Sequence, residues 1–237
     1  MTTPVVGGSF IEAPLPDRHL PVQRRLTGRH DRSVQNAARL PSMGRPREFD
    51  ETQVLREARS QFRHKGYAGT SVADLTEATR LGKGSLYGAF GDKRQLFLRV
   101  LDDYSAGSVV AVRDALSGDG PAIDRLRSYL LAIADGSARD GDGCLLANST
   151  AELAGQDEEV AARVSATFRA LGALIEAAVR EAQAEGDIDP DADARAVGGM
   201  LLAVARGMEA LGTGGASRRS LRRTAEQTLA VLASRER

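Results

Sequence analysis

At 237 residues, with 42% hydrophobic and 27% charged residues, the chain has an ordinary soluble composition and the length of one large domain or two small ones. It has no apolar run of the about 18–20 residues that a membrane span needs, and its single cysteine, Cys144, excludes an internal disulfide framework and a multi-cysteine zinc site. The net charge of zero is a cancellation, because residues 1–42 and 43–95 each carry three excess positive charges and residues 96–237 carry six excess negative charges. We expect a cytoplasmic protein without metal or cofactor, and the basic front weakly favours nucleic acid.

The first 43 residues have the composition of a disordered tail. They hold five of the eight prolines, which interrupt any helix, and their apolar residues follow neither a helical nor a strand period. They also lack the continuous apolar stretch of a secretory signal. Met43 then begins the basic arm Gly44-Arg45-Pro46-Arg47. Two interpretations stay open: translation starts at Met43, or residues 1–42 are a basic tail that adds nonspecific affinity for DNA.

From Asp50 onwards the spacing of apolar residues becomes helical. Apolar residues recur every four positions over residues 54–62, and Gly66 is predicted to close this first helix. Beyond two short helices, Asp92 with Gln95 three positions later predicts a capping box at the start of a longer helix.

The rest of the chain carries helical spacing as well. Apolar stripes predict further helices over about residues 123–133, 144–153, 160–179, 197–211 and 221–232. No stretch alternates in the manner of a strand. The sequence therefore predicts an all-α fold of about nine helices.

Two short helices joined by a tight turn lie near the N-terminal end of this pattern. We predict a helix over residues 71–79 with Ser71 as its N-cap, a turn at residues 80–82, and a second helix over residues 83–89. Such a pair inside a three-helix unit is a helix-turn-helix, in which the second helix enters the major groove and the first helix braces it. Lys83 adds a positive charge where free helix N–H groups favour phosphate.

Two runs in this segment carry a family resemblance, and they are Thr70-Ser71-Val72-Ala73-Asp74-Leu75 and Lys83-Gly84-Ser85-Leu86-Tyr87-Gly88-Ala89-Phe90-Gly91-Asp92-Lys93-Arg94-Gln95-Leu96-Phe97. Together with the arm at residues 44–47, they resemble the DNA-binding domain of the TetR family. The resemblance covers about residues 44–97 and is specific, because several spaced elements agree in order. The remainder fits the family's divergent helical ligand-binding domain, and the run Gly143-Cys144-Leu145-Leu146-Ala147-Asn148 is similar to one in a branch of the family.

The resemblance implies a disordered tail over residues 1–43, a helix-turn-helix DNA-binding domain over residues 44–97, and a ligand-binding and dimerisation domain over residues 98–237. It further implies a homodimeric repressor that binds an inverted-repeat operator in double-stranded DNA and is released by a small apolar or electrophilic effector. The DNA-contacting residues that it implies are Arg45, Arg47, Thr70, Ser71, Lys83, Gly84, Ser85, Tyr87 and Lys93.

The chain departs from the family pattern at two places. The turn of the helix-turn-helix often carries a glycine where this chain has Arg80, which predicts a strained or differently shaped turn. Two positions that are often bulky are Gly88 and Ala89 here and offer little base readout. This departure shifts the base readout towards Lys83, Ser85 and Thr79.

The effector is expected to bind among the C-terminal helices in an apolar cavity with few polar groups. The candidate lining residues are Tyr104, Cys144, Asn148, Phe168, Met200 and Val204. For Cys144 two interpretations stay open: a reactive thiol that switches the protein, or a small buried apolar residue. In the sequence Arg139 is the closest cation to this thiol.

Small residues recur along one C-terminal helix at Gly198, Gly199, Ala203 and Gly207, and they permit close approach of another helix. With the apolar stripe at 221–232 they predict a four-helix dimer interface, two helices from each subunit. Internal packing of the same two helices is the alternative.

Other classes of function fit the sequence less well. An enzyme is not expected, because no nucleophile with a base and no metal cluster is apparent among three histidines and one cysteine. A DNA-binding architectural protein without an effector is the main alternative, and the sequence does not separate an activator from a repressor.

Overall fold

The computed structural model describes residues 49–140 and 143–233. Within these ranges the chain forms α-helices and one isolated β-bridge, between Ile188 and Ala233, which confirms the all-α prediction. The helices are α1 (Glu51–Gly69), α2 (Val72–Thr79), α3 (Lys83–Phe90), α4 (Lys93–Leu116), α5 (Ala122–Asp140), α6 (Leu145–Leu153), α7 (Glu158–Glu185), α8 (Ala194–Thr213) and α9 (Arg218–Ala230). The arm residues Arg45 and Arg47 and the predicted tail lie outside the described residues.

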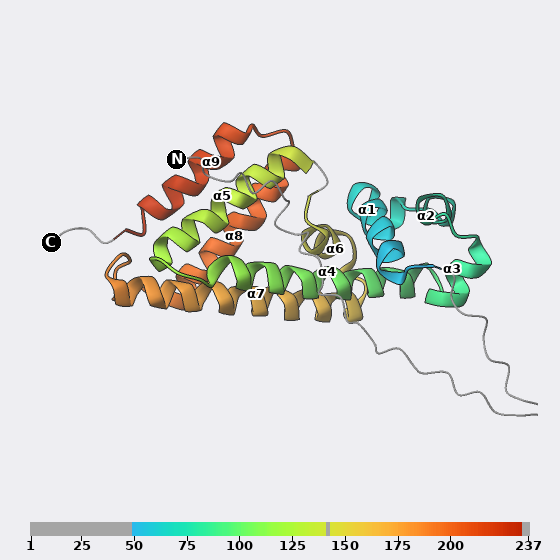
Figure 1. The fold of residues 1–237 in the computed structure, drawn as a ribbon, viewed down its shortest axis with the longest axis horizontal. Coiled ribbons are helices and arrows are strands. Elements are labelled where there is room, and N and C mark those ends of the chain that lie inside the picture. The colour runs from blue at the N-terminus through green and yellow to red at the C-terminus, as the bar shows by residue number, and fades with distance from the viewer. Residues whose placement is uncertain (1–48, 141–142, 234–237) are drawn as a thin grey trace, which may run out of the picture.

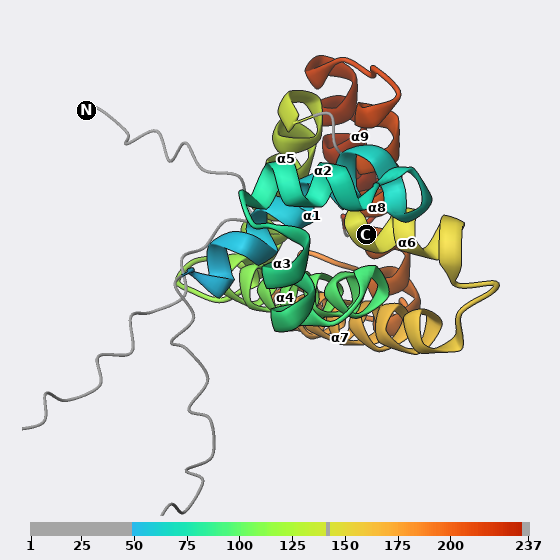
Figure 2. The same ribbon diagram turned by 90° about the vertical axis from the view of Figure 1, so that its right-hand side faces the viewer.

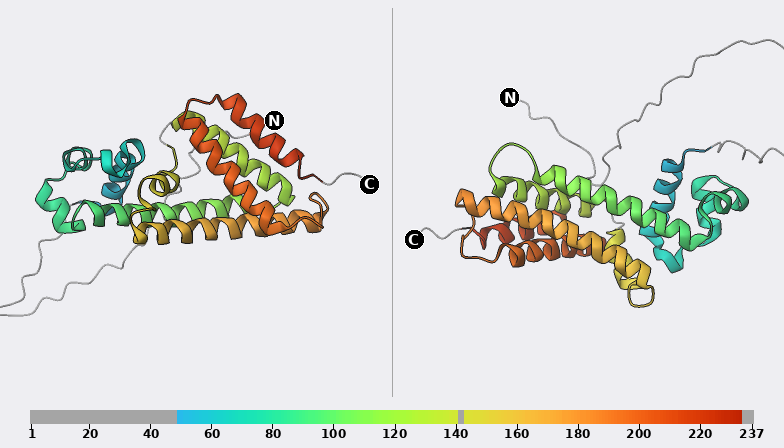
Figure 3. Two further views of the ribbon diagram at one scale, coloured as in Figure 1. Left: turned by 180° about the vertical axis from the view of Figure 1, so that it is seen from behind. Right: turned by 90° about the horizontal axis from the view of Figure 1, so that it is seen from below.

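Two long helices, α4 and α7, lie side by side along the molecule and organise the rest of it (Figure 1). The short helices α1 to α3 gather at the end where α4 begins, while α5, α8 and α9 pack together at the other end (Figures 1 and 2). Helix α6 lies between the two ends and contacts α1, α4 and α7 (Figure 3). None of the described helices is both long and apolar enough to cross a membrane.

The short N-terminal helices begin where the sequence predicts. Asp50 caps α1, and Ser71 caps α2 in a full capping box with Asp74. Asp92 caps α4 by accepting a hydrogen bond from the Gln95 N–H at 2.7 Å, which is one of the two bonds of the predicted box. These caps fix where three helices begin, and the cap matters most for α2, which at 8 residues is too short to be stable alone.

Gly66 interrupts α1 but does not end it. Its backbone has φ 73° and ψ 174°, so the helix kinks there and continues for one more turn to Gly69. The buried Thr70 then closes the segment, because its hydroxyl donates a 2.6 Å hydrogen bond to the Gly66 carbonyl. The prediction of a helix end at Gly66 was therefore wrong by three residues, although the break in helical backbone is at the predicted position.

The turn between α2 and α3 has the strained shape that the sequence predicts. Arg80 adopts the left-handed conformation, with φ 56° and ψ 22°, and is the one non-glycine residue with positive φ in the described part of the chain. A side chain with a Cβ disfavours this region, whereas glycine enters it freely. The turn keeps its geometry because Leu75 and Leu86, one on each side, are fully buried and hold the two helices together.

Packing inside the C-terminal region divides the predicted dimer interface into two parts. On α9 the apolar stripe is internal, because Leu221, Ala225 and Leu229 are 1–3% exposed and α9 packs on α5. On α8, Gly198 is also internal, since a Cβ there would lie 3.0 Å from the Glu176 backbone nitrogen of α7. For Gly199 and Gly207 no atom lies within 4 Å of the Cβ position, so this face of α8 is open. The apolar stripe of α9 therefore packs internally, and the four-helix dimer interface of α8 and α9 stays a prediction.

Replacing Arg80 by glycine is expected to raise the free energy of unfolding by about 0.5–1 kcal/mol, because glycine relieves the left-handed strain at the cost of some chain entropy. Arg80→Ala is the control, since it removes the charge and keeps the Cβ. Urea unfolding of both variants checks this expectation, and equal stability of the glycine and alanine variants would contradict it.

Candidate nucleic-acid interface

Helix α3 presents an outer face that is almost bare of side chains. Lys83, Gly84 and Ser85 at its N-terminal end are exposed, whereas Leu86 points inward and is fully buried. No atom lies within 4 Å of the Cβ position of Gly84 or of Gly88. Another backbone or a base edge can therefore approach α3 closely, and no side chain caps the N–H groups at its start, which leaves them available to a phosphate.

Two lysines flank this face, each beside an aromatic ring. The Lys83 ammonium lies 5.9 Å from the centroid of the Tyr87 ring, and the Lys93 ammonium lies 4.3 Å from that of Tyr67. The sequence prediction included Lys83, Tyr87 and Lys93 but not Tyr67, which also packs 4.9 Å from the Phe97 ring. No motif signals Tyr67, because its position depends on the kink at Gly66.

Ser71 and Thr70, the predicted contacts at the start of α2, have different surroundings. Ser71 is exposed, and its hydroxyl and N–H both donate to Asp74, at 2.6 and 2.7 Å. Thr70 is 0% exposed and its hydroxyl is bonded to backbone carbonyls. Its side chain does not reach the surface, so the structure corrects the expectation of a DNA contact and gives Thr70 the task of positioning α2. Lys65 also fixes α2, because its ammonium lies 2.5 Å from Asp74 and, with Ser71, lowers the pKa of that carboxyl.

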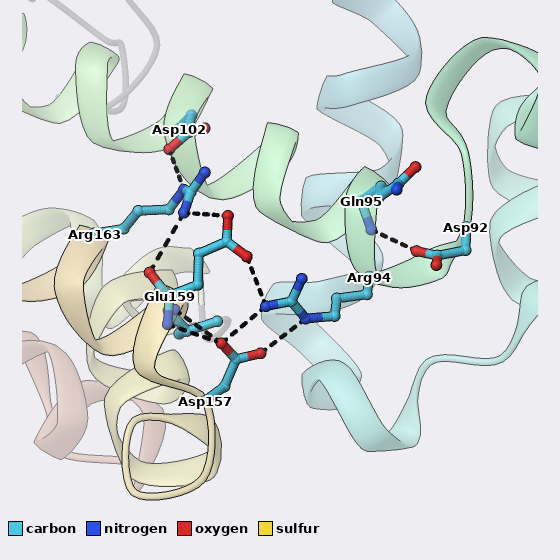
Figure 4. Close-up of polar contacts among 8 residues, drawn as sticks. Asp92, Arg94, Gln95, Asp102, Asp157, Glu159 and Arg163 are labelled. Carbon is cyan, nitrogen blue, oxygen red and sulfur yellow. Dashed lines mark hydrogen bonds and ion pairs between the residues drawn. The ribbon is translucent and has the colours of Figure 1, made fainter.

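A network of ion pairs, the junction clamp, joins the start of α4 to the start of α7 (Figure 4). Arg94 donates through Nε and Nη2 to both oxygens of Asp157, at 2.9 and 3.0 Å, and through Nη2 to Glu159 at 2.8 Å. Arg163 extends the clamp to Asp102 and Glu159, at 2.9 Å each. Hydrogen bonds from Arg94 lower the pKa values of the Asp157 and Glu159 carboxyls. The clamp sets the direction in which α4 leaves the DNA-binding unit.

A second set of contacts joins α6 to α1. At the start of α6, Arg63 donates through Nε and Nη2 to the Gly143 carbonyl, at 3.2 and 2.9 Å. At the other end of α6, the Glu152 carboxylate accepts from the N–H groups of Tyr67 and Ala68, at 2.8 and 2.5 Å. These two N–H groups begin the last turn of α1 after its kink, where a carboxylate is favoured. Helix α6 therefore holds α1 at two points.

Polar side chains from four elements meet in the interior of the C-terminal region. The Cys144 sulfur is 2% exposed and accepts from Arg206 Nη1 at 3.1 Å and from the Tyr104 hydroxyl at 3.8 Å. Arg206 Nη1 also lies 2.9 Å from the Glu209 carboxylate. The charges of Arg206 and Glu209 both act on the pKa of the buried Tyr129 hydroxyl. Burial raises the pKa values of Tyr104, Cys144 and Glu209, although Arg206 opposes this effect at each.

The structure brings together some of the six predicted lining residues and not others. Tyr104 and Cys144 are in contact, and Asn148 lies one turn along α6, where its amide donates to the Arg63 carbonyl at 3.4 Å. Phe168 and Val204 are partly buried against the apolar core. Met200 is 39% exposed on the outer face of α8, so it does not line the interior of this chain. The charged partners Arg206 and Glu209 make this interior polar instead of apolar.

The architecture is that of a helix-turn-helix protein: a small N-terminal unit exposes a short second helix, and a larger helical body carries it. The family model for bacterial regulatory proteins of the tetR family matches residues 54–100, and the model for the tetracyclin repressor-like C-terminal domain matches residues 122–229. The match to the first model spans most of α1, all of α2 and α3, and the start of α4, and the match to the second spans α5 to α9.

Individual proteins give the same result. The HTH-type transcriptional repressor ComR of Escherichia coli K12 is 30% identical over 191 residues, which are 79% of this chain and 91% of ComR. A cysteine mutant of the TetR family transcriptional regulator CifR, solved with 26-base-pair operator DNA, superposes with a TM-score of 0.68 at 31% identity and covers 78% of this chain and 98% of its own. The reduced form of NemR of E. coli shares the fold, with a TM-score of 0.70, 19% identity and coverage of 78% of this chain and 98% of its own. The chain therefore belongs to the TetR family of transcriptional regulators.

The junction clamp predicts a pH-dependent effect of Arg94→Gln on stability. Because the folded pKa values of Asp157 and Glu159 are lowered, their contribution is complete above the unfolded values of about 4 and is lost as the pH falls through the folded values. The loss of unfolding free energy in Arg94→Gln should be largest near pH 7 and should shrink towards pH 3. Urea unfolding across this range measures it. Arg180→Gln, which breaks a pair with Glu176 inside α7, is the control, and a pH-independent loss in Arg94→Gln would refute the expectation.

Proposed function

We propose that this protein is a homodimeric repressor that binds an inverted-repeat operator and is released by a small-molecule effector. The observation that carries the proposal is the bare, lysine-flanked face of α3, which matches what a reading helix needs. Relatives that are named repressors and a relative with operator DNA bound support it. Double-stranded DNA is accordingly the partner of the N-terminal unit.

The proposed DNA contacts follow from the surface of that unit. Lys83, Gly84 and Ser85 face the groove, while Tyr87 and Lys93 contact phosphates on either side of it. Ser71 is exposed at the start of α2 and contacts the DNA backbone there. Lys83, Gly84 and Ser85 can make few bidentate contacts to bases in the major groove. The affinity for DNA therefore depends largely on phosphate contacts and on the shape of the operator.

The proposed dimer forms through the open face of α8. Exposed small residues follow one another along this face at Gly199, Ala203 and Gly207, and the exposed Met200 and Leu211 flank them. Small residues let two helices approach closely, and an exposed apolar stripe favours association. A dimer of this kind presents two α3 helices to successive major grooves about 34–36 Å apart.

The proposed effector acts in the interior of the C-terminal region, beside Tyr104 and Cys144. An electrophile that reaches the Cys144 thiol is one candidate, because Arg206 donates to the sulfur and stabilises its anionic form. Opposing this, burial raises the pKa of the thiol, and Cys144 also fits the interpretation of a buried structural residue. An apolar effector suits this interior less well, because the charged Arg206–Glu209 pair lies beside the same sulfur.

Selection of genomic DNA fragments by the purified protein, followed by footprinting at fixed salt, tests the proposal. A short inverted repeat protected on two successive turns is the expected result. Diffuse protection without a shared sequence would replace the proposal with the architectural alternative, a DNA-binding protein without an effector.

Lys83→Ala and Tyr87→Phe should each weaken operator binding about tenfold, because each removes one contact to DNA worth about 1–1.5 kcal/mol. Lys93→Ala, which removes the cationic phosphate contact, should reduce the slope of log affinity against log salt by about 0.9. Fluorescence anisotropy at several salt concentrations measures both effects. Arg180→Ala, which removes an exposed charge near the C-terminal end of α7, should bind as the unmodified protein does. Unchanged affinity in both α3 variants would refute the assignment.

Ala203→Glu should convert the dimer to a monomer and reduce operator affinity at least tenfold, because it places two buried carboxylates against each other in the α8 interface. Ala166→Glu, at an exposed position of α7, is the matched control. Sedimentation equilibrium measures the mass of both variants. A dimer that persists in Ala203→Glu would show that the interface lies elsewhere.

A further inference from the structure

The last turn of α1, residues 67–69, is held by a carboxylate from the helical body. Because Gly66 leaves the helical φ and ψ region, the N–H groups of Tyr67 and Ala68 begin a new turn and need partners from outside it. The Glu152 carboxylate of α6 accepts from both, at 2.8 Å from the Tyr67 nitrogen and 2.5 Å from the Ala68 nitrogen. One carboxylate thus fixes the backbone that carries the Tyr67 ring.

Gly66 leaves the room that this carboxylate occupies. A Cβ at position 66 would lie 2.9 Å from Glu152 Oε2, which is closer than such atoms approach in proteins. The residue that kinks α1 therefore also lets the carboxylate reach the backbone. Both oxygens of Glu152 are used, one for each N–H group, so the contact depends on a carboxylate and on the length of its side chain.

The Tyr67 ring in turn holds the Lys93 side chain. The Lys93 ammonium lies 4.3 Å from the ring centroid, and the ring itself packs 4.9 Å from the Phe97 ring. No carboxylate of residues 49–140 and 143–233 pairs with Lys93. A cation is also unfavourable at the first residue of a helix, where Lys93 lies. The attraction between ring and ammonium therefore fixes the position of this charge.

The segment that carries Glu152 also fixes the backbone of Lys93. Arg94, the next residue, is bound by Asp157 in the junction clamp (Figure 4). Asp157 ends the short loop that follows α6 and caps α7. The stretch from Glu152 to Asp157 thus holds Lys93 from two sides, through the ring beneath its ammonium and through its neighbour in the chain.

We propose that Glu152 is a positioning residue for DNA binding: by fixing the Tyr67 ring, its carboxylate holds the Lys93 ammonium where it meets a DNA phosphate. The inference rests on the proposed function, because that function makes Lys93 a phosphate contact. Glu152 acts without touching DNA. Its negative charge alone repels DNA, so a role in charge and a role in positioning give opposite changes of affinity when the charge is removed.

NMR of the free protein tests the positioning step without DNA, because the chain has only three lysines, Lys65, Lys83 and Lys93. Protein with ¹³C-labelled lysine gives one set of Cε–Hε signals for each, and Lys93→Arg identifies that of Lys93. Protons above an aromatic ring are shifted upfield, so we expect an upfield Lys93 signal. In Glu152→Gln this shift should shrink, because an amide offers one acceptor oxygen to two N–H groups. An unchanged shift would overturn the proposal.

Operator affinity tests the consequence for DNA binding. Glu152→Gln should weaken binding about three- to tenfold, although it removes a negative charge. Combined with Lys93→Ala, it should add no further loss, because the carboxylate acts through the ammonium. Glu158→Gln is the matched control, since it removes an exposed carboxylate from the first turn of α7, and it should bind at least as tightly as the unmodified protein.

Two variants of Tyr67 decide the question if Glu152→Gln does not fold. Tyr67→Phe keeps the ring, whereas Tyr67→Leu removes it and leaves the N–H group that Glu152 binds. Tyr67→Leu should therefore bind the operator at least about threefold more weakly than Tyr67→Phe. Affinities are compared at a temperature at which circular dichroism shows each variant to be folded. Equal affinity of the two variants would contradict the role of the ring and overturn the proposal.

The outcomes distinguish a failure of this inference from a failure of the proposed function. If Lys93→Ala weakens operator binding and Glu152→Gln does not, the proposed function stands and the role of Glu152 is wrong. If the two losses multiply in the double variant, Glu152 acts by another route and the proposal is also wrong. If Lys93→Ala leaves the affinity unchanged, the proposed phosphate contact fails, and the inference fails with it.

Discussion

The position of α3 depends on polar contacts at the junction between the small N-terminal unit and the helical body. Helix α4 belongs to both, because it begins at Lys93 beside the reading helix and ends at Leu116 in the body. Its direction at the start is set by Arg94, which binds the cap residue of α7. The second connection, α6 to α1, ends at the residues that precede α2. These polar contacts act together with the apolar packing of α1 on α4, in which the rings of Phe62 and Phe97 lie 5.1 Å apart, to position the reading helix.

Local signals in the sequence were sufficient for the elements of the DNA-binding unit. Ser71 and Asp92 were predicted as caps because a short polar side chain before an apolar run has one common use. The strain at Arg80 was predicted because the backbone of the turn is set by its neighbours, whatever residue occupies it. Thr70 was misjudged, because the sequence gives a hydroxyl at the start of α2 but not the kink at Gly66 that turns it inward.

Contacts between residues that are far apart in the sequence could not be predicted from local signals. The cation beside Cys144 is Arg206, which is 62 positions away, whereas a search along the sequence gave Arg139. The small residues of α8 show the same limit. Gly198 and Gly199 are neighbours with equal chemistry, yet a helix turns by about 100° per residue, so one faces α7 and the other faces outward. Which of them is internal depends on where α7 lies.

The free energies of the contacts at the junction are of the magnitude that a small molecule can alter. Coupling between two ligands of a protein is typically about 1–3 kcal/mol, and one hydrogen bond contributes a net of about 0.5–1.5 kcal/mol. The bonds of Arg63 to Gly143 and of Glu152 to the end of α1 are therefore of the same order as the coupling that an effector has to produce. A buried apolar contact costs more free energy to break than one hydrogen bond, because burial of a large apolar side chain contributes about 1.5–3 kcal/mol. A few polar contacts between α6 and α1 are therefore an arrangement that a competing hydrogen-bonding partner can alter, because each of them contributes only a small net free energy.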